Sequence, residues 1–408
     1  MSLIGTPSTS TTTSNSNSNS NRTNSPAKWR MPAEWTSKAR RHEACLILYP
    51  HNTAVFRQQC QYAQLEIDAI AKAIVHHGDE DVILFCSPLD HVAMNAVTEK
   101  FRDEPRIHVM ECSSNDTWAR DTGPTFVLDD DDESRLIAID WQFNGYGGPA
   151  LGTYWPCDLD KKVASTMCRA IADKYSVPIH IAHVPIVLEG GSIHVDGEGT
   201  CLTTAECLLN VNRNPDMTKE QIEITVLTAL GCTKMLWLPL GLAYDEDTNG
   251  HIDNMACFVR PGEIILSWTD DCERDPENYD RCRQAMEYLS HETDANGRTL
   301  TVQKLYLPPP LRYTQEEVQS INIKDGTSER QIGERLAASY VNFYTANKAI
   351  IVPQFGVEPS DGDAISTLQS AFPNHKIIGV PSREILLGGG NIHCVTQQMP
   401  MPLVRSNV

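Results

Sequence analysis

One order of elements recurs five times along this chain: an amphipathic helical stretch, a short apolar strand, a loop rich in glycine and aspartate, and a β-hairpin. The second copy is the clearest. Apolar residues lie at helical spacing over 161–175, residues 179–184 are typical of a strand, and a hairpin is predicted over 192–204. Helices of the other copies are predicted at 56–76, 218–230, 278–290 and 363–372.

The two ends of the chain complete this pattern. The fifth hairpin is unfinished because the chain ends soon after Thr396, and a strand predicted at 44–49 has no partner in the first unit. Pairing these segments would close a ring and remove two exposed strand edges. We therefore expect an α/β fold, a five-bladed propeller closed by an N-terminal strand, with the polar loops meeting at one mouth. The alternative is an ordinary α/β protein with short strands.

Composition divides the chain into one domain and two tails. Residues 1–26 are almost wholly Ser, Thr, Asn, Gly and Pro, so we expect a disordered tail over 1–28. A single catalytic domain over 29–400 and a C-terminal tail over 401–408 complete the organisation. The first segment lacks acids and carries Arg22, as transit peptides do, but one arginine is thin evidence for an organellar address.

The charge and the cysteines narrow the function classes. A net charge of -19 argues against nucleic acid and anionic membranes as partners. No apolar run has the length of a membrane span. Thirteen cysteines without CxxC pairs favour reduced thiols over a disulfide framework or a zinc site. We expect a cytoplasmic protein without a metal or cofactor, and the sequence leaves open whether it is a monomer or a homodimer.

Cys394 is the candidate nucleophile. It follows three glycines at 388–390, and such a run allows the backbone to approach a ligand closely, so Gly389 and Gly390 are candidate binding residues. A thiol in this position needs a histidine and carboxylates within reach. Polar loops of the other units offer them: Asp121, Glu189, His251 and Asp253.

Two His-x-Asp pairs compete for the role of base. Asp196 begins a predicted hairpin turn, where aspartate is common for structural reasons, whereas Asp253 precedes its strand. Aligning 190–194 with 389–393 places His194 opposite His393, which should face away from the thiol if both lie on strands. His251 with Asp253 is therefore the favoured pair.

A thiol, an imidazole and three carboxylates suit a cationic substrate. The acids would repel the oxyanion of a protease reaction, but they match the forked N–H donors of a planar guanidinium. Two aspartates can hold that group while sulfur attacks its carbon. Trp118, close to Asp121, offers a ring face for a cation or an alkyl chain.

These loops resemble the motifs of agmatine deiminases, in the guanidine-modifying superfamily, and especially its plant members. The similarity covers roughly residues 29 to 400. The matching segments are 31–35, 118–124, 189–196, 247–254, 335–344 and 388–394. The resemblance implies the pentein fold, with Cys394 as nucleophile, His251 as general acid/base, Asp121 and Asp253 on the guanidinium and Glu189 beside the histidine. Residues 49–57 depart from the family pattern, which puts substrate selectivity in question.

The function that this resemblance implies is hydrolysis of agmatine to N-carbamoylputrescine and ammonia, a step of putrescine and polyamine synthesis, through a covalent thiouronium. Free arginine or peptidyl arginine is the alternative substrate, and transfer of an amidino group is an alternative reaction. A non-catalytic guanidine or polyamine binder is the least favoured reading. The residue that binds the distal amine stays open among Asp245, Glu246 and Asp247.

Overall fold

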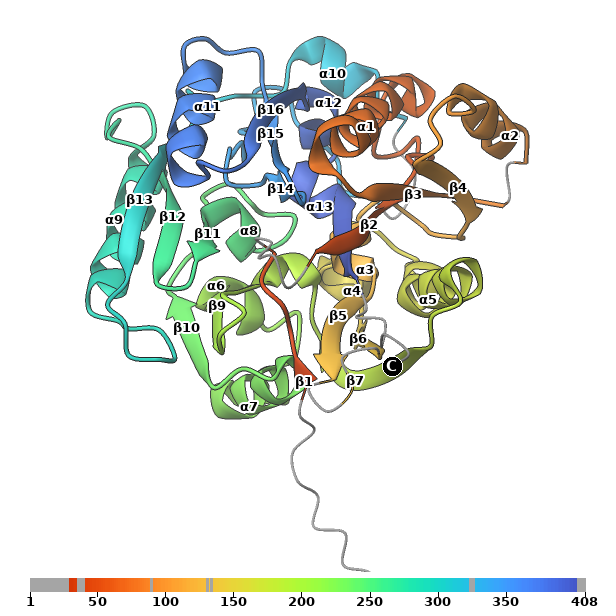
Figure 1. Ribbon diagram of the computed structural model, residues 1–408. Helices are drawn as coiled ribbons and strands as arrows, with labels where there is room; N and C mark the ends of the chain where they lie inside the picture. The colour runs from red at the N-terminus through yellow and green to blue at the C-terminus, as the bar shows by residue number, and fades with distance from the viewer. Residues whose placement is uncertain are drawn as a thin grey trace, which may run out of the picture.

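The computed structural model describes residues 29–34, 41–88, 91–129, 132, 135–322 and 327–401. The expected N-terminal tail and nearly all of the C-terminal one lie outside the described residues. The architecture is mixed α/β, with five separate sheets and no closed barrel among the described residues. Figure 1 shows the sheets around a common centre, with the longer helices on the outside and several one-turn helices near the middle.

The first four sheets follow each other along the chain. They contain β1 (Trp29–Arg30), β5 (Thr125–Asp129), β6 (Leu136–Gln142) and β7 (Ile179–Val187); β8 (Ile193–Val195), β9 (Thr200–Thr204) and β10 (Lys234–Leu238); β11 (Ala256–Arg260), β12 (Glu263–Trp268) and β13 (Thr301–Tyr306); β14 (Tyr344–Thr345), β15 (Ala349–Gln354) and β16 (Lys376–Pro381). The fifth joins both ends of the chain: β17 (Thr396–Pro400), β2 (His42–Leu48), β3 (Asp81–Cys86) and β4 (Ile107–Glu111).

Helices connect the strands and cover the sheets. The longer ones are α1 (Gln61–Ala73), α2 (His91–Lys100), α5 (Val163–Tyr175), α7 (Lys219–Leu230), α9 (Pro276–Ser290) and α11 (Ser360–Ala371). The shorter ones are α3 (Ala119–Thr122), α4 (Gly148–Leu151), α6 (Ala205–Leu208), α8 (Ile252–Met255), α10 (Gln315–Gln319), α12 (Arg383–Leu387) and α13 (Ile392–Val395). The predicted helices are present, with shifted ends, whereas β4 was not expected from the sequence.

The repeating module begins at a different element from the one that the sequence suggested. Strand β10, which follows α7, pairs in parallel with β9 of the preceding hairpin, and β7, β13 and β16 behave in the same way. Each of these sheets is thus an antiparallel hairpin, a crossover helix and a parallel strand. A parallel neighbour needs a long crossover, so the helix and the strand after it complete the hairpin that came before.

The pairing of the chain ends is confirmed. Strand β17 runs antiparallel to β2, with Thr396 opposite Ile47, and β2 pairs in parallel with β3. Side chains of β2 alternate between two core clusters, since Cys45 and Ile47 pack in one while Ala44 and Leu46 pack in the other. The strand is therefore buried on both faces, which explains its continuous apolar sequence.

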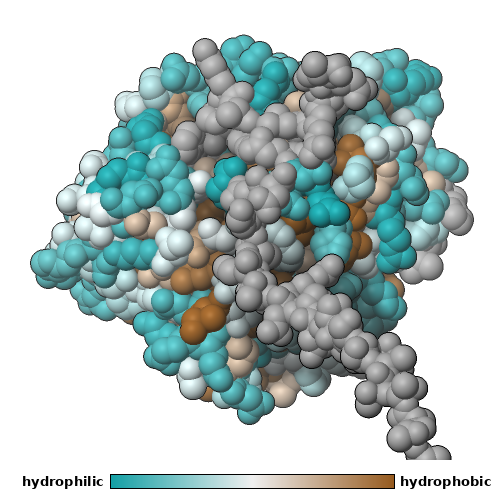
Figure 2. Space-filling model, turned by 60° about the horizontal axis from the view of Figure 1, so that its bottom comes forward, coloured by the Kyte–Doolittle hydropathy of each residue, from teal (hydrophilic) through white to brown (hydrophobic). Residues whose placement is uncertain are grey.

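Among the described residues, no helix has the length and apolar character to cross a bilayer. The described part of the face in Figure 2 is mostly hydrophilic, and hydrophobic residues appear there in small separate areas.

We predict that the domain cannot fold without β2. A chain that begins at residue 51 leaves the edges of β3 and β17 unpaired and removes an apolar strand from two core clusters, so it should unfold or aggregate. A chain that begins at residue 29 is the matched control and should melt like the full chain. It keeps Trp29 and Arg30, which pair with β5.

Thermal unfolding by circular dichroism and size-exclusion chromatography measure this difference. A monodisperse chain from residue 51 with a cooperative melt would show that β2 is dispensable.

Candidate active site

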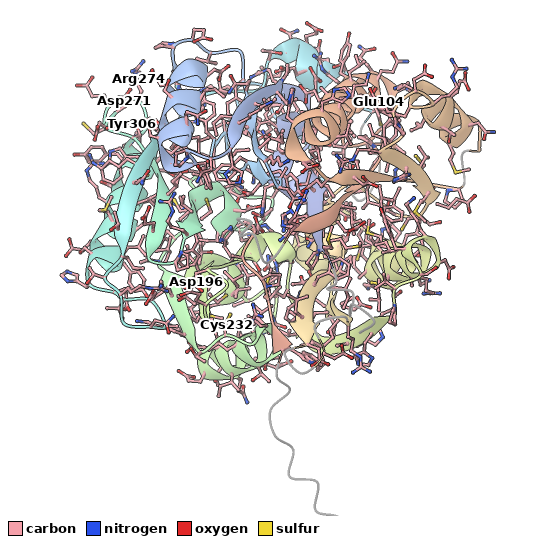
Figure 3. The ribbon with its side chains drawn as sticks, viewed as in Figure 1. Glu104, Asp196, Cys232, Asp271, Arg274 and Tyr306 are labelled. Carbon is pink, nitrogen blue, oxygen red and sulfur yellow. The ribbon has the colours of Figure 1, made fainter. Side chains whose placement is uncertain are left out.

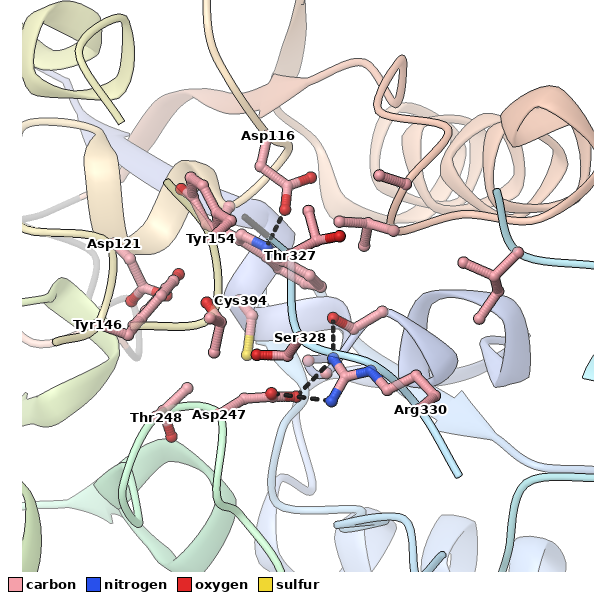
Figure 4. A pocket seen from close by; sticks show the side chains of 18 residues that line it. Asp116, Asp121, Tyr146, Tyr154, Asp247, Thr248, Thr327, Ser328, Arg330 and Cys394 are labelled. Carbon is pink, nitrogen blue, oxygen red and sulfur yellow. Dashed lines mark hydrogen bonds and ion pairs between the residues drawn. The ribbon is translucent and has the colours of Figure 1, made fainter. Parts of the chain in front are cut away.

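One pocket contains the nucleophile predicted from the sequence. It contains about 530 Å³ of empty space when its opening to solvent is included. Loops from several sheets form its wall (Figure 4). The main lining residues are Asp116, Trp118, Asp121, Tyr146, Asp247, Arg330, Gly389, Gly390 and Cys394.

The Cys394 thiol lies on α13, just before β17, and not inside a strand as the sequence suggested. The side chain of Asn342 donates a hydrogen bond to its Sγ at 3.1 Å, and Sγ is 3.5 Å from Oδ2 of Asp253. Burial, Asp253 and Asp121 together raise the pKa of the Cys394 thiol well above its ordinary value. The thiol is therefore neutral until a positive charge arrives nearby.

Asp121 and Asp253 are buried on the one-turn helices α3 and α8, not in open loops at a mouth as we expected. Burial raises the pKa of Asp121 to about 6 although His251 opposes this shift. Its carboxylate accepts hydrogen bonds from the Tyr146 hydroxyl at 2.8 Å and from the Gly191 amide at 2.9 Å. Burial would also raise the pKa of Asp253, but the contact with His393 outweighs it and lowers that pKa.

His251 lies between two acids and is completely buried. Its Nε2 is 3.5 Å from Oε2 of Glu189, and its Nδ1 is 3.9 Å from Oδ1 of Asp121. Burial alone would lower the pKa of His251, but Asp121 and the neighbouring acceptors outweigh it and hold the pKa well above its ordinary value. A raised pKa favours the imidazolium form of His251, which can donate a proton.

Arg213 pairs with Glu189 and favours its ionised form, although no sequence pattern pointed to this arginine. Nε of Arg213 donates to Oε1 of Glu189 at 2.8 Å, and both side chains are fully buried. Arg213 and His251 lower the pKa of Glu189 below its ordinary value despite burial. The Oε2 atom remains directed to His251.

Two glycines after Glu189 bring these groups together. A Cβ atom at Gly191 would lie 2.7 Å from Nδ1 of His251 and 2.9 Å from both an Asp121 and an Asp253 oxygen. At Gly190 it would overlap the Arg120 carbonyl oxygen. The sequence Glu189-Gly190-Gly191 therefore places a carboxylate in the site without adding side-chain volume between the histidine and the aspartates.

The remaining residues considered from the sequence fall into two groups: some line the pocket, and Asp196 stabilises a turn. Trp118, Gly389 and Gly390 line the pocket, and Trp118 Nε1 donates to Asp116 at 2.9 Å. Asp196 instead accepts hydrogen bonds from the amides of Glu198 and Thr200 in the β8–β9 turn, as expected for a structural aspartate. Figure 3 places it with Cys232 among the elements of that sheet.

His393 does not simply face away from the thiol. Because 392–395 form a helical turn, the strand alternation assumed for His393 does not apply. Its Nδ1 is 2.9 Å from Asp253 Oδ2, and its Nε2 is 3.1 Å from the Glu34 carboxylate. Glu34 comes from the N-terminal segment of the domain, so only the folded chain brings these residues together.

Two ionisable residues of the pocket, Arg330 and Asp116, were not identified from the sequence. Nη2 of Arg330 is 2.8 Å from Oδ2 of Asp247, and the pair lies beside Gly389. Burial and Asp160 raise the pKa of Asp116 to about 8. Asp245, by contrast, binds the Thr248 hydroxyl and the His251 amide within its own loop. Of the three loop acids considered, Asp247 is the one that faces the pocket.

Only part of segment 49–57, which differs from the family pattern, lines the pocket. Ala54 and Val55 line it, and the Phe56 ring lies 6.1 Å from the Trp118 ring. Tyr49 lies elsewhere and donates to Asp68 at 3.0 Å. This segment can therefore influence the shape of the wall, while the acids and the thiol come from other loops.

Comparisons with known proteins converge on one family. A family model described as Porphyromonas-type peptidyl-arginine deiminase matches residues 30–400. Agmatine deiminase of the plant Medicago truncatula is 47% identical over 381 residues, covering 91% of this chain and 96% of the relative. Agmatine deiminase of Stutzerimonas stutzeri is 46% identical, with 92% and 96% covered.

Solved structures give the same result. Agmatine deiminase of Enterococcus faecalis has a TM-score of 0.81 at 37% identity, with 92% of this chain and 97% of that chain covered. A C. jejuni agmatine deiminase with a cysteine-to-serine substitution and bound substrate has a TM-score of 0.72 at 28% identity, with 92% and 97% covered.

We predict that the charge of Asp253 holds down the reactivity of the Cys394 thiol. Because burial and the nearby acids raise the pKa of Cys394 above its ordinary 9.0, alkylation by iodoacetamide should keep accelerating through pH 9. Asp253→Asn removes one negative charge, lowers the thiol pKa and should speed alkylation several-fold at about pH 8. Peptide mass mapping follows Cys394, with the exposed Cys272 as internal reference. An unchanged rate would contradict this electrostatic account.

Proposed function

We propose that this chain, which belongs to the Porphyromonas-type peptidyl-arginine deiminase family, hydrolyses agmatine to N-carbamoylputrescine and ammonia. The observation that carries the proposal is the position of the Cys394 thiol within 3.5 Å of Asp253, in a pocket that Asp121 also lines. Two carboxylates around a thiol suit a planar cation with forked N–H donors, and a guanidinium is such a group.

Substrate binding creates the nucleophile. The guanidinium pairs with Asp121 and Asp253 and compensates the two negative charges that disfavour the thiolate. The thiol then gives its proton to water, and the thiolate sulfur forms a bond to the guanidinium carbon. Positioning that carbon over sulfur between two fixed acids is the main contribution of the site to the first step.

Proton transfer by His251 completes both halves of the reaction. The imidazolium gives its proton to the departing nitrogen, ammonia leaves, and a thiouronium on Cys394 remains. The neutral imidazole then takes a proton from water, and the oxygen adds to the same carbon. The C–S bond breaks as the C=O bond forms, the proton left on that oxygen passes to sulfur, and N-carbamoylputrescine leaves. Glu189 and Asp121, the acids beside His251, stabilise its charged form in each cycle.

The far end of the pocket favours an amine over an amino acid head. Asp247 offers a carboxylate to the distal ammonium of agmatine. Arginine is the second candidate substrate because Arg330 lines the same pocket and could meet a substrate carboxylate. Arg330 already pairs with Asp247, however, and an incoming carboxylate would have to break that pair. Names of the relatives also point to agmatine.

We extend the proposal to the fold, the pathway and the location of the protein. The five sheets correspond to the blades of a propeller within a single catalytic domain over 29–400, and the β2–β17 pairing closes it. A role in putrescine and polyamine synthesis follows from the proposed product. A cytoplasmic location is consistent with the mostly buried cysteines.

We predict that Cys394→Ser abolishes ammonia release while the protein stays folded, because a hydroxyl here is too weak a nucleophile. Ammonia release from agmatine, arginine and a peptidyl arginine, measured side by side, tests the substrate. Agmatine should have the highest kcat/KM. A serine variant that retains substantial activity would exclude covalent catalysis by Cys394, and arginine as the best substrate would favour the second candidate. Formation of a new amidine without ammonia would indicate amidino transfer.

We predict that Gly191→Ala lowers kcat/KM at least about a hundredfold, because the new methyl group would displace His251 from the two aspartates. The matched control is Gly362→Ala, at an exposed position of α11 with only a Glu358 oxygen, 3.4 Å away, near the new Cβ. That change should leave kinetics unaltered and slightly raise the melting temperature. Near-normal activity of Gly191→Ala would contradict the tight arrangement described above.

A further inference from the structure

Cys207 is a buried thiol beside the catalytic histidine that the proposed reaction does not use. It lies on α6, where the Thr204 side chain accepts a hydrogen bond from its amide. Ligand atoms of Glu189, Cys207 and His251 lie within 4.8 Å of one another, and all three residues are fully buried. Carboxylate, thiol and imidazole are the three side-chain groups that bind zinc in proteins.

One ligand separation already matches a tetrahedral zinc site, and the others lie within 4.8 Å. Zinc bond lengths put neighbouring ligand atoms about 3.3 to 3.6 Å apart, and Nε2 of His251 is 3.5 Å from Oε2 of Glu189. These two atoms are fully buried, and apart from facing each other they have no hydrogen-bond partner among the described residues. Buried polar atoms with so few partners are unusual, and here the Cys207 sulfur lies within 4.8 Å of both.

Arg213 and Asp121 orient Glu189 and His251 so that each keeps one atom free for a metal. Arg213 binds Oε1 of Glu189 and leaves Oε2 for the centre. Asp121 faces the other ring nitrogen of His251 at 3.9 Å, as carboxylates commonly do behind a metal-bound histidine. Asp121 also lines the pocket, so the cluster adjoins the route by which substrate enters. The positive charge of Arg213 is balanced by Glu189, and Asp121 favours a further cation.

We propose that Glu189, Cys207 and His251 form an inhibitory site for zinc-like divalent cations. Binding displaces one proton from the Cys207 thiol and one from the imidazolium, and the metal takes the electron pairs that these protons held. The fourth position remains open to water. A metal on His251 prevents it from carrying protons, so occupancy stops turnover. The thiolate and imidazole ligands select Zn²⁺ or Cd²⁺ over Mg²⁺ and Ca²⁺.

Binding is measured without turnover. Cys394→Ser removes the nucleophilic thiol and keeps the three ligands, and Co²⁺ serves as the optical probe. We expect one Co²⁺ per chain with the tetrahedral d–d bands and the sulfur-to-cobalt charge-transfer band. Adding Cys207→Ser should remove the charge-transfer band and weaken binding at least about tenfold. A spectrum that survives Cys207→Ser, or the absence of stoichiometric binding in a chain that circular dichroism shows to be folded, overturns the proposal.

Inhibition is measured on the chain with an intact nucleophile. Zn²⁺ should abolish ammonia release, chelation by EDTA should restore it, and an equal concentration of Mg²⁺ should have no effect. In Cys207→Ser, compared with its own uninhibited rate, half-inhibition should require at least about tenfold more Zn²⁺. Equal sensitivity of the two chains would place the metal on Cys394 and overturn the assignment. Because the cobalt experiment needs no reaction, failure of this proposal and failure of the proposed function are distinguishable.

Discussion

The site depends on the contacts that the Asp253 carboxylate makes with Cys394 and His393. Its Oδ2 atom is 3.5 Å from the Cys394 sulfur and 2.9 Å from His393 Nδ1. The other ring nitrogen of His393 contacts the Glu34 carboxylate, and Glu34 also pairs with the Arg120 guanidinium at 3.0 Å. This series of contacts joins α8, α13, α3 and the N-terminal segment of the domain. Cys394, the acids around it and both ends of the described chain are therefore held by one buried polar network.

Such a network keeps its charges only if every member is compensated. Burial would raise the pKa of Glu34, but Arg120, His393 and His194 hold it well below its ordinary value. His393 has a raised pKa despite burial and Arg120, because Glu34 and Asp253 outweigh them. Burial raises the pKa of Asp121 to about 6, and the charge of His251 offsets this rise only in part. A carboxylate whose negative charge is only partly compensated thus lines the same pocket as Cys394, which suits the proposed guanidinium substrate.

Much of this arrangement could be predicted from local sequence. The helices have clear apolar periodicity, the Asp196 turn has its glycines, and β2 and β17 were identified as edges that need each other. Cys394, His251, Asp121, Asp253 and Glu189 were recognisable because glycine-rich or turn-like segments surround them. The rest depends on contacts between distant residues. The pairing of each strand with the preceding hairpin, the Arg213–Glu189 and Arg330–Asp247 pairs and the Glu34–His393 contact follow from tertiary packing. An ordinary arginine or glutamate in a loop does not indicate its partner.

The central claim is that a guanidinium held by Asp121 and Asp253 forms a covalent bond with Cys394. The most direct test is intact-mass analysis of the protein quenched in acid during turnover of agmatine, followed by peptide mapping. The account predicts a mass increase equal to agmatine minus ammonia, located on Cys394. Quenched protein that releases ammonia but never carries this adduct, even in a variant slowed at His251, would contradict the account.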